Sequence, residues 1–158
     1  MDYQIRQIGP DDLEVVVALI REFAEHEDLS DYCEVTVGRL DAAMFGENAM
    51  VEGLIVFAGG TPVGYALFVP TFSSFRGQRA LYLDDLYVNE GHRGKGIGRT
   101  LLKKIASIAA DRGFERIDFL VLDDNERAKA FYRSLGAVCN PRDRHFKFTD
   151  EAFRRLSE

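Results

Sequence analysis

The sequence predicts an α/β protein whose mixed sheet carries helices on both faces. Strand-like segments alternate with segments in which apolar residues recur every three or four positions, as on one face of a helix. The expected order is β-α-α-β-β-β-α-β-α-β-β. The pair Gly59-Gly60 between two strand-like segments indicates a hairpin, and therefore an antiparallel strand pair at the centre.

The N-terminal half is expected to contain three strands and two helices. Asp11 or Asp12 can cap a helix that ends near His26, and Thr36 can cap a short helix that ends at Gly46. The expected strands are residues 3–8, 49–58 and 61–72.

The C-terminal half begins with residues 81–88, which read as a strand, followed by a glycine-rich loop and a helix to about Arg112. A strand is expected over residues 116–122, then a helix capped by Asn125 and stopped by Gly136. Two short strands, 137–139 and 145–148, and a final helix after Thr149 complete the prediction.

Composition limits the classes of protein. A chain of 158 residues without repeats or linkers predicts one domain spanning residues 1–158. A net charge of −6 argues against nucleic acid as a partner. The sequence shows neither an apolar run long enough to span a membrane nor the pattern of a secretory signal. We therefore expect a cytoplasmic location. Cys33 and Cys139 are expected to be free, buried or half-buried thiols. His26, His92 and His145 lack the spacing of a metal site or catalytic triad, so no metal is expected, and each is interpreted as a surface or packing residue.

The loop after residues 81–88 is the most distinctive segment. Glycines at 91, 94, 96 and 98 allow tight turns close to a ligand, and the N–H groups of the following first helical turn favour an anion. Several cations lie in or just after this loop: Arg93, Lys95, Arg99, Lys103 and Lys104. We interpret the loop as a pyrophosphate site. It is not a Walker A loop, because Ile97 stands where the lysine is required, and the glycine spacing of a dinucleotide-binding fold is one residue short.

Residues 93–98 (Arg-Gly-Lys-Gly-Ile-Gly) resemble the Arg/Gln-x-x-Gly-x-Gly/Ala signature of the GNAT acyl-CoA N-acyltransferases. Asn125 and the segment 130–137 resemble that family's later Asn-x-x-Ala-x-x-Phe-Tyr-x-x-x-Gly motif, and the resemblance covers almost the whole chain. It implies a GNAT fold, with a mostly antiparallel mixed sheet and a central splayed strand pair. Segments similar to the diamine acetyltransferases, including the spermidine/spermine enzymes, are 19–24, 72–75, 81–85 and 130–132.

The resemblance implies acetyl-CoA as co-substrate. The amides of residues 93–98 would bind its pyrophosphate, with charge added by Lys95 and Arg99, and the backbone of Leu86, Tyr87 and Val88 would bind the pantetheine arm. The implied donor-binding set is Leu86, Tyr87, Val88, Arg93, Gly94, Lys95, Gly96, Ile97, Gly98, Arg99, Asn125 and Tyr132. Tyr132 is the expected acid for the departing thiolate, because a phenol is protonated at neutral pH.

A primary amine must lose a proton before it attacks the thioester, and Asp84 and Asp85 are the candidate acceptors. Neighbouring strand residues face opposite sides unless a bulge intervenes, so we expect the two carboxylates to have different tasks. Asp84 stands where the diamine acetyltransferases typically carry the longer Glu. Direct deprotonation, proton transfer through water, and electrostatic positioning of the substrate remain open for Asp84, and a structural hydrogen bond remains open for Asp85.

The acceptor is expected to be a polyamine or diamine, because the acidic stretch from Glu22 to Glu34 would attract a cation. The predicted substrate-binding residues are Glu25, Glu27, Asp28, Phe75, Asp84 and Asp85. The alternatives are an amino acid, an amino sugar, a thialysine-like compound or a protein lysine as acceptor, or a non-catalytic acyl-CoA sensor. The resemblance also implies a homodimer.

Overall fold

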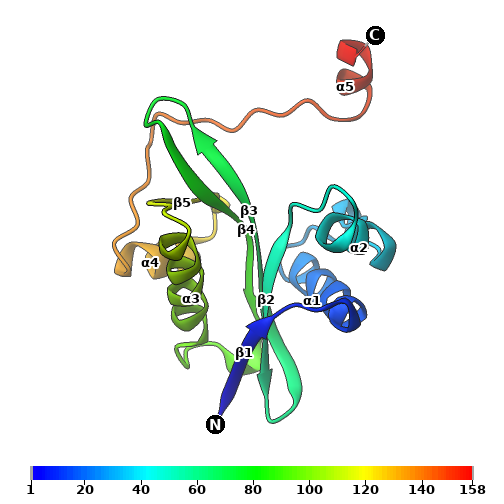
Figure 1. Ribbon diagram of the computed structural model, residues 1–158, viewed down its shortest axis with the longest axis vertical. Coiled ribbons are helices and arrows are strands. Elements are labelled where there is room, and N and C mark those ends of the chain that lie inside the picture. The colour runs from blue at the N-terminus through cyan, green and yellow to red at the C-terminus, as the bar shows by residue number, and fades with distance from the viewer. Residues whose placement is uncertain (1, 158) are drawn as a thin grey trace. The chain divides into compact units, whose positions relative to one another are not determined.

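The structure is a computed structural model that describes residues 2–157. The chain forms two compact units, one up to Leu120 and one from Val121 onward. The first unit contains the five-stranded sheet and three helices (Figure 1). Its elements are β1 (Tyr3–Gln7), α1 (Leu13–His26), α2 (Val37–Phe45), β2 (Glu52–Ala58), β3 (Thr61–Ser73), β4 (Gln78–Val88), α3 (Ile97–Asp111) and β5 (Ile117–Phe119), with short 3₁₀ turns at η1 (Pro10–Asp12), η2 (Ser30–Tyr32) and η3 (Glu90–His92).

The sheet has the order β1-β2-β3-β4-β5, which confirms the predicted mixed sheet. The first four strands are antiparallel neighbours, whereas β5 is parallel to β4. β5 pairs only with Leu81–Leu83, so β4 continues to Val88 without β5 beside it. This divergence is the splayed strand pair that the sequence resemblance implied.

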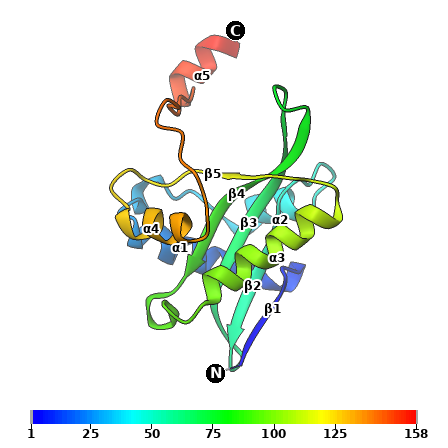
Figure 2. The ribbon, with the colours of Figure 1, turned by 90° about the vertical axis from the view of Figure 1, so that its left-hand side faces the viewer.

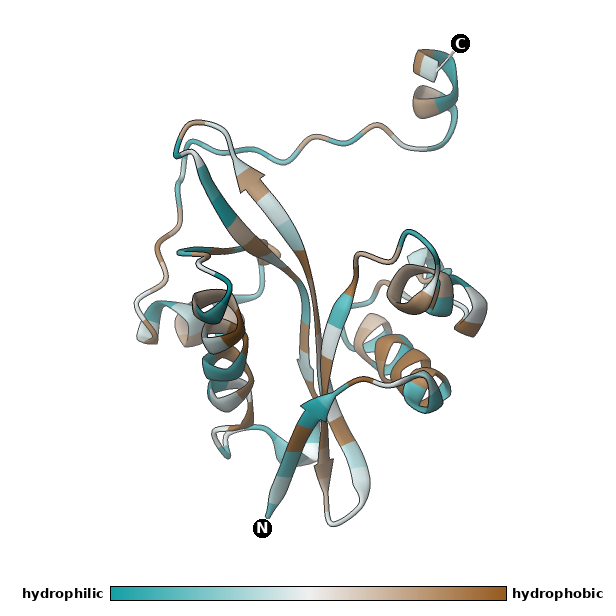
Figure 3. Ribbon diagram, in the orientation of Figure 1, coloured by the Kyte–Doolittle hydropathy of each residue, from teal (hydrophilic) through white to brown (hydrophobic). Residues whose placement is uncertain are grey.

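Two hydrophobic clusters hold helices on opposite faces of the sheet, as Figures 1 and 2 show. α3 contributes Ile97, Leu101 and Ile105 to one cluster, whereas α1 and α2 contribute residues such as Val16 and Leu40 to the other. Figure 3 shows the hydrophobic residues concentrated in the central strands and in stripes along α1 and α3. Burial of these stripes against both faces is the main stabilising contribution to the fold.

Asp12 does not cap α1 with its side chain. Its carboxylate instead accepts two hydrogen bonds from Arg6, at 2.6 and 2.7 Å, and one from the Gly9 backbone N–H at 2.7 Å. The Arg6 guanidinium holds the pKa of Asp12 below its usual value. The ion pair therefore ties the end of β1 to the start of α1, a contact that local capping patterns do not predict.

The unit from Val121 onward contains α4 (Glu126–Ser134) and α5 (Asp150–Ser157). Asn125 caps α4 as predicted, accepting a hydrogen bond from the Ala128 N–H at 2.9 Å. The strands predicted over 137–139 and 145–148 are wrong: no strand forms within residues 121–157. A strand needs a neighbour for its backbone groups, and these segments have none; Val138 and Phe146 are 97% and 88% exposed.

Three smaller expectations are corrected or completed. The strand predicted from residue 116 to 122 is restricted to Ile117–Phe119, where β4 supplies its partner. Cys33 is half-buried and Cys139 is exposed, and both are free thiols. Across residues 2–157, no helix is long and apolar enough to cross a membrane.

Gly64 provides a test of how closely β3 approaches β4. A Cβ at this position would lie 2.6 Å from the Tyr87 carbonyl oxygen and 3.2 Å from the Val88 Cα, so backbone must shift to admit it. We expect Gly64→Ala to lower the free energy of unfolding by about 1–3 kcal/mol in urea denaturation.

The matched control is Gly38→Ala within α2, where a Cβ meets nothing within 4 Å. Alanine is the better helix former by about 1 kcal/mol, so this variant should be as stable as the wild type or more stable. Equal stability of the two alanine variants would contradict the close packing at Gly64.

Candidate active site

The centre of β4 contains one more residue than the strand it pairs with. Leu67 of β3 lies opposite Asp85 and Phe68 lies opposite Leu83, so Asp84 has no partner in β3. Asp84 is the extra residue of a β-bulge, a feature that re-aims side chains and often lies beside active sites.

The bulge brings both carboxylates to the same face of the sheet. Leu83 and Leu86 both pack in the α3 cluster although they are three residues apart, so the alternation of faces slips by one position between them. Asp84 therefore points away from α3, and Asp85 does too, as its contact with Tyr65 of the α1–α2 cluster confirms. Consecutive strand residues were expected to face opposite sides unless a bulge intervenes, and the extra residue is such a bulge, which interrupts the period of two.

Asp85 is held by a buried phenol. The Tyr65 hydroxyl donates a hydrogen bond of 2.9 Å to the Asp85 carboxylate. Burial is the main cause that raises the pKa of Asp85 to about 6; the Tyr65 hydrogen bond opposes this rise and the charge of Asp84 adds to it. Asp84 is exposed, yet partial desolvation also raises its pKa. The two carboxylates thus differ in access: Asp84 can meet a ligand, and Asp85 lies behind it.

An open hollow of about 530 Å³ lies on the same face as these carboxylates. Its lining residues come from α1 and the turn after it: Ala18, Arg21, Glu22, Glu25, Ser30 and Cys33. Two tyrosines connect the hollow with Asp85: the Tyr87 hydroxyl donates to Glu22 at 2.8 Å, and the Tyr87 ring lies 6.2 Å from that of Tyr65, which donates to Asp85. Glu22 and Glu25 of the hollow and the two aspartates of β4 therefore lie on the α1 side of the sheet, a charge distribution that favours a cationic ligand.

The glycine-rich loop presents unpaired backbone donors. Gly94 and Gly96 have φ of 76° and 81°, a conformation that glycine adopts without strain. Among residues 2–157, no acceptor is found for the backbone N–H groups of residues 94–99, and no side chain caps α3. These donors at the start of a 15-residue helix are the arrangement that binds phosphate groups.

The side chains of the loop behave differently from its backbone. The Lys95 ammonium donates to the Gly91 carbonyl oxygen at 2.8 Å, and the Arg93 guanidinium is engaged by Val88 and His26. The Arg93 side chain is therefore engaged within the protein, whereas the backbone amides of the loop are the groups left available to an anion.

The two motif residues of the second unit can be described locally. Asn125 begins α4, and Tyr132 lies within it, beside Phe131 with ring centroids 5.1 Å apart. Burial raises the pKa of Tyr132 to about 12, so the phenol stays protonated at neutral pH. This is the protonation state that a proton donor requires.

The remaining predicted residues divide into two groups. Glu25 lines the hollow. Glu27 and Asp28 come directly after the last residue of α1 in the sequence and are not among the lining residues. Phe75 is fully exposed in the turn that precedes Gln78, the first residue of β4. Gln78 lies roughly 20 Å from Asp84 along the strand, so the structure of residues 2–120 does not bring Phe75 to the hollow. The sequence placed Glu22 in the acidic stretch, but it did not predict the contacts of Tyr65 with Asp85, of Glu22 with Tyr87 or of His26 with Arg93, because each joins distant segments.

The raised pKa of Asp85 predicts that the stability of the folded protein depends on pH. Between an unfolded value near 3.8 and a folded value of about 6, the folded protein binds more protons than the unfolded chain. Its stability therefore falls as pH rises through this window. In Asp85→Asn, the amide oxygen can still accept from Tyr65 but cannot ionise. Relative to wild type, this variant should gain at most roughly 3 kcal/mol between pH 4 and pH 7 in urea denaturation. A stability difference that does not change with pH would contradict the assignment.

Known proteins resemble this chain in sequence and in fold. Residues 16–137 match the model of the acetyltransferase (GNAT) family. A thialysine N-epsilon-acetyltransferase from Bos taurus is 38% identical over 97% of this chain and 96% of its own length. A human spermidine/spermine N(1)-acetyltransferase-like protein 1 is 34% identical over 87% of this chain, which corresponds to 21% of that longer protein. Among solved structures, an aminoglycoside acetyltransferase from a soil metagenomic sample has a TM-score of 0.79 at 20% identity and covers 94% of this chain and 97% of its own. The chain belongs to the GNAT acetyltransferase family, whose members use acetyl-CoA as co-substrate to acetylate amines.

Proposed function

We propose that this GNAT N-acetyltransferase acts on a small cationic amine, most simply a polyamine or diamine. The observation that carries the proposal is the bulge at Asp84, which brings two carboxylates to the face that bears the acidic hollow. A polyamine carries several separated positive charges, and Glu22 and Glu25 with Asp84 offer separated negative charges to match them.

The donor side is proposed to use backbone groups. The free N–H groups of residues 94–99 fit the pyrophosphate of acetyl-CoA. The pantetheine arm would lie along Leu86, Tyr87 and Val88, where β4 has lost its parallel neighbour and its edge can receive an extended ligand. Bound acetyl-CoA supplies the thioester carbonyl that the amine attacks.

Asp84 is proposed as the group that receives the proton of the ammonium substrate, directly or through one water. Its exposure suits contact with a substrate, and its raised pKa makes it a stronger base than an ordinary aspartate. Asp85, fixed by Tyr65, keeps a second carboxylate next to it and so favours a cation at Asp84. Tyr132 is proposed to donate its proton to the departing CoA thiolate, consistent with its raised pKa.

A second acceptor class is supported by Arg21, which lines the hollow beside the glutamates. An amino acid with a side-chain amine presents a carboxylate as well as an ammonium group, and Arg21 could pair with that carboxylate. The 38% identical bovine relative is named for acetylating thialysine, which has this chemistry. Arg21 therefore provides the feature that distinguishes the two acceptor classes.

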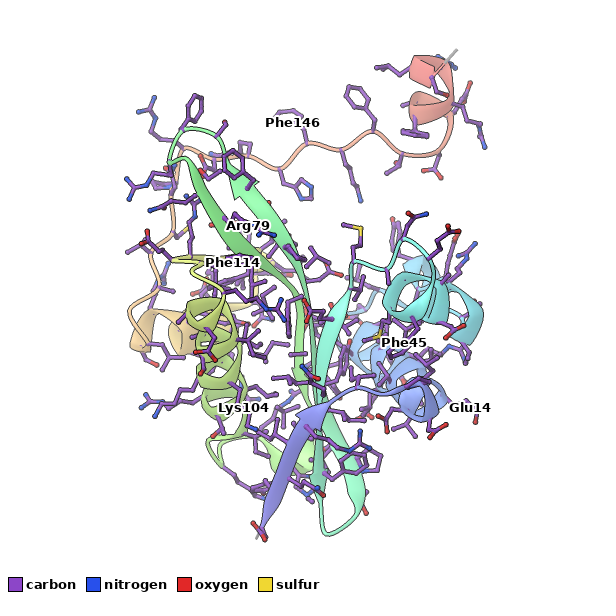
Figure 4. The ribbon with its side chains drawn as sticks, viewed as in Figure 1. Glu14, Phe45, Arg79, Lys104, Phe114 and Phe146 are labelled. Carbon is purple, nitrogen blue, oxygen red and sulfur yellow. The ribbon has the colours of Figure 1, made fainter. Side chains whose placement is uncertain are left out.

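The assembly is proposed to be a homodimer. In the second unit, Val138, Phe146, Phe153 and Leu156 are exposed, and apolar side chains of this kind are often covered in an assembly. Figure 4 shows Phe146 on the segment between α4 and α5. The cytoplasmic location and the absence of nucleic-acid, membrane and metal partners stay predictions.

A panel of acceptors tests the proposed function. With acetyl-CoA, release of the CoA thiol would be measured for spermidine, spermine, putrescine and thialysine in the wild type and in Arg21→Gln. We expect spermidine or spermine to have the highest kcat/KM and to be little affected by Arg21→Gln. Thialysine turnover that is higher and falls about tenfold in Arg21→Gln would favour the amino acid class. Turnover of none of the four would contradict both, and acetyl-CoA binding without any turnover would favour a sensor.

Tyr132→Phe separates chemistry from binding in the same assay. Loss of the acid should lower kcat by about 100-fold while CoA binding stays unchanged. Full activity of this variant would show that another group protonates the thiolate.

A further inference from the structure

The side chain of Arg93 connects the donor loop with the end of α1. Its Nε donates to the Val88 carbonyl oxygen at 2.7 Å, and its Nη1 lies 2.8 Å from Nε2 of His26, the last residue of α1. A guanidinium can only donate, so His26 Nε2 is the acceptor in this contact. No local sequence pattern predicts this contact, since His26 and Arg93 are 67 positions apart.

A second contact runs beside the first. The Tyr87 hydroxyl donates to the Glu22 carboxylate at 2.8 Å, and the Tyr87 ring stacks on Phe23 at 5.1 Å. The Arg93 guanidinium also lies over the Tyr87 ring, 5.5 Å from its centroid. Glu22 and His26 are one helical turn apart, so both contacts leave the same face of α1.

These contacts join the two ligand regions of the molecule. Arg93 is the residue from which the unpaired N–H groups of residues 94–99 begin, and Glu22 lines the acidic hollow. A ligand that orders the loop must also order the Arg93 backbone, and through the guanidinium it restrains the last turn of α1. That turn leads into the acidic residues Glu27 and Asp28.

We propose that His26 is a positioning residue that couples occupancy of the donor loop to the conformation of the α1 end, and thereby to the amine-binding hollow. His26 acts through Arg93 and touches neither substrate. The inference rests on the proposed assignment of the loop to CoA, but it does not depend on which amine is the acceptor. Coupling of this kind is reciprocal, so the amine would favour donor binding to the same extent.

Hydrogen exchange with CoA alone as the probe tests the coupling without any acceptor. The amides of Glu27 and Leu29 report on the α1 end, because they donate to Phe23 and Ala24 carbonyl oxygens at 3.1 and 2.8 Å. In the wild type, CoA should slow exchange in the loop and also slow exchange of these two amides by about fivefold. The Gly46 amide, which closes the end of α2, serves as an internal reference that CoA should leave unchanged.

Three variants define the role of His26. His26→Ala should keep the CoA protection of the loop and lose most of the protection at Glu27 and Leu29. His26→Gln, whose amide oxygen can accept from Arg93, should restore part of it. Glu14→Gln is the matched control on α1, since Glu14 is exposed and points away from the sheet (Figure 4), and it should behave as wild type.

The outcomes separate this inference from the proposed function. If CoA protects neither segment, the donor assignment fails and the coupling fails with it. If CoA protects the loop but not the α1 end in the wild type, or if His26→Ala behaves as wild type, only the coupling is overturned. Should His26→Ala prove unfolded, Tyr87→Phe replaces it, because it removes the parallel bond to Glu22 and should also reduce protection at Glu27 and Leu29.

Discussion

The single extra residue in β4 is the constraint on which the site depends. A strand with regular alternation would place Leu81, Leu83, Asp85 and Tyr87 on one face. The α3 cluster instead takes Leu81 and Leu83 before the bulge and Leu86 and Val88 after it. Apolar side chains can pack against α3 both before and after Asp84 only because Asp84 is left out of the pairing with β3. Asp85 and Tyr87 are thereby directed to the α1 side of the sheet, where Asp85 accepts a hydrogen bond from Tyr65 of β3 and Tyr87 donates one to Glu22 of α1.

In the proposed function, the same strand serves two ligands through different chemical groups. Its side chains on the α1 face would contribute charge to the amine region, while its edge beyond Leu83 and the loop that follows would contribute backbone donors and acceptors to CoA. Backbone groups suit the acyl donor, which is the same molecule for every acceptor, since they recognise phosphate and amide groups without side-chain specificity. Side chains suit the acceptor, because specificity for one amine requires charges at defined separations. The Arg93–His26 contact lies where these two functions meet.

Local sequence patterns predicted most of the fold because the helices and the central strands are strongly periodic. They located α1, α3 and the Asn125 cap. The glycine spacing indicated a phosphate-binding loop, and the resemblance to the GNAT family implied CoA as its ligand. They failed where a distant segment decides the outcome. The sequence pattern contains no sign of the bulge, since Asp84 and Asp85 look like ordinary consecutive strand residues until β3 is laid beside them. The strands expected after Gly136 failed for the related reason that no neighbour pairs with them.

Asp84 and Asp85 lie on one face of the sheet, and the charge of Asp84 raises the pKa of Asp85. Carbon-13 NMR titration of the Asp85 carboxyl in wild type and in Asp84→Asn measures this directly. Asp85 should titrate near its raised pKa of about 6 in wild type and at a lower pH once the neighbouring charge is removed. An Asp85 titration that is the same in both proteins would mean that the carboxylates face opposite sides of the sheet, and the shared amine site would be wrong.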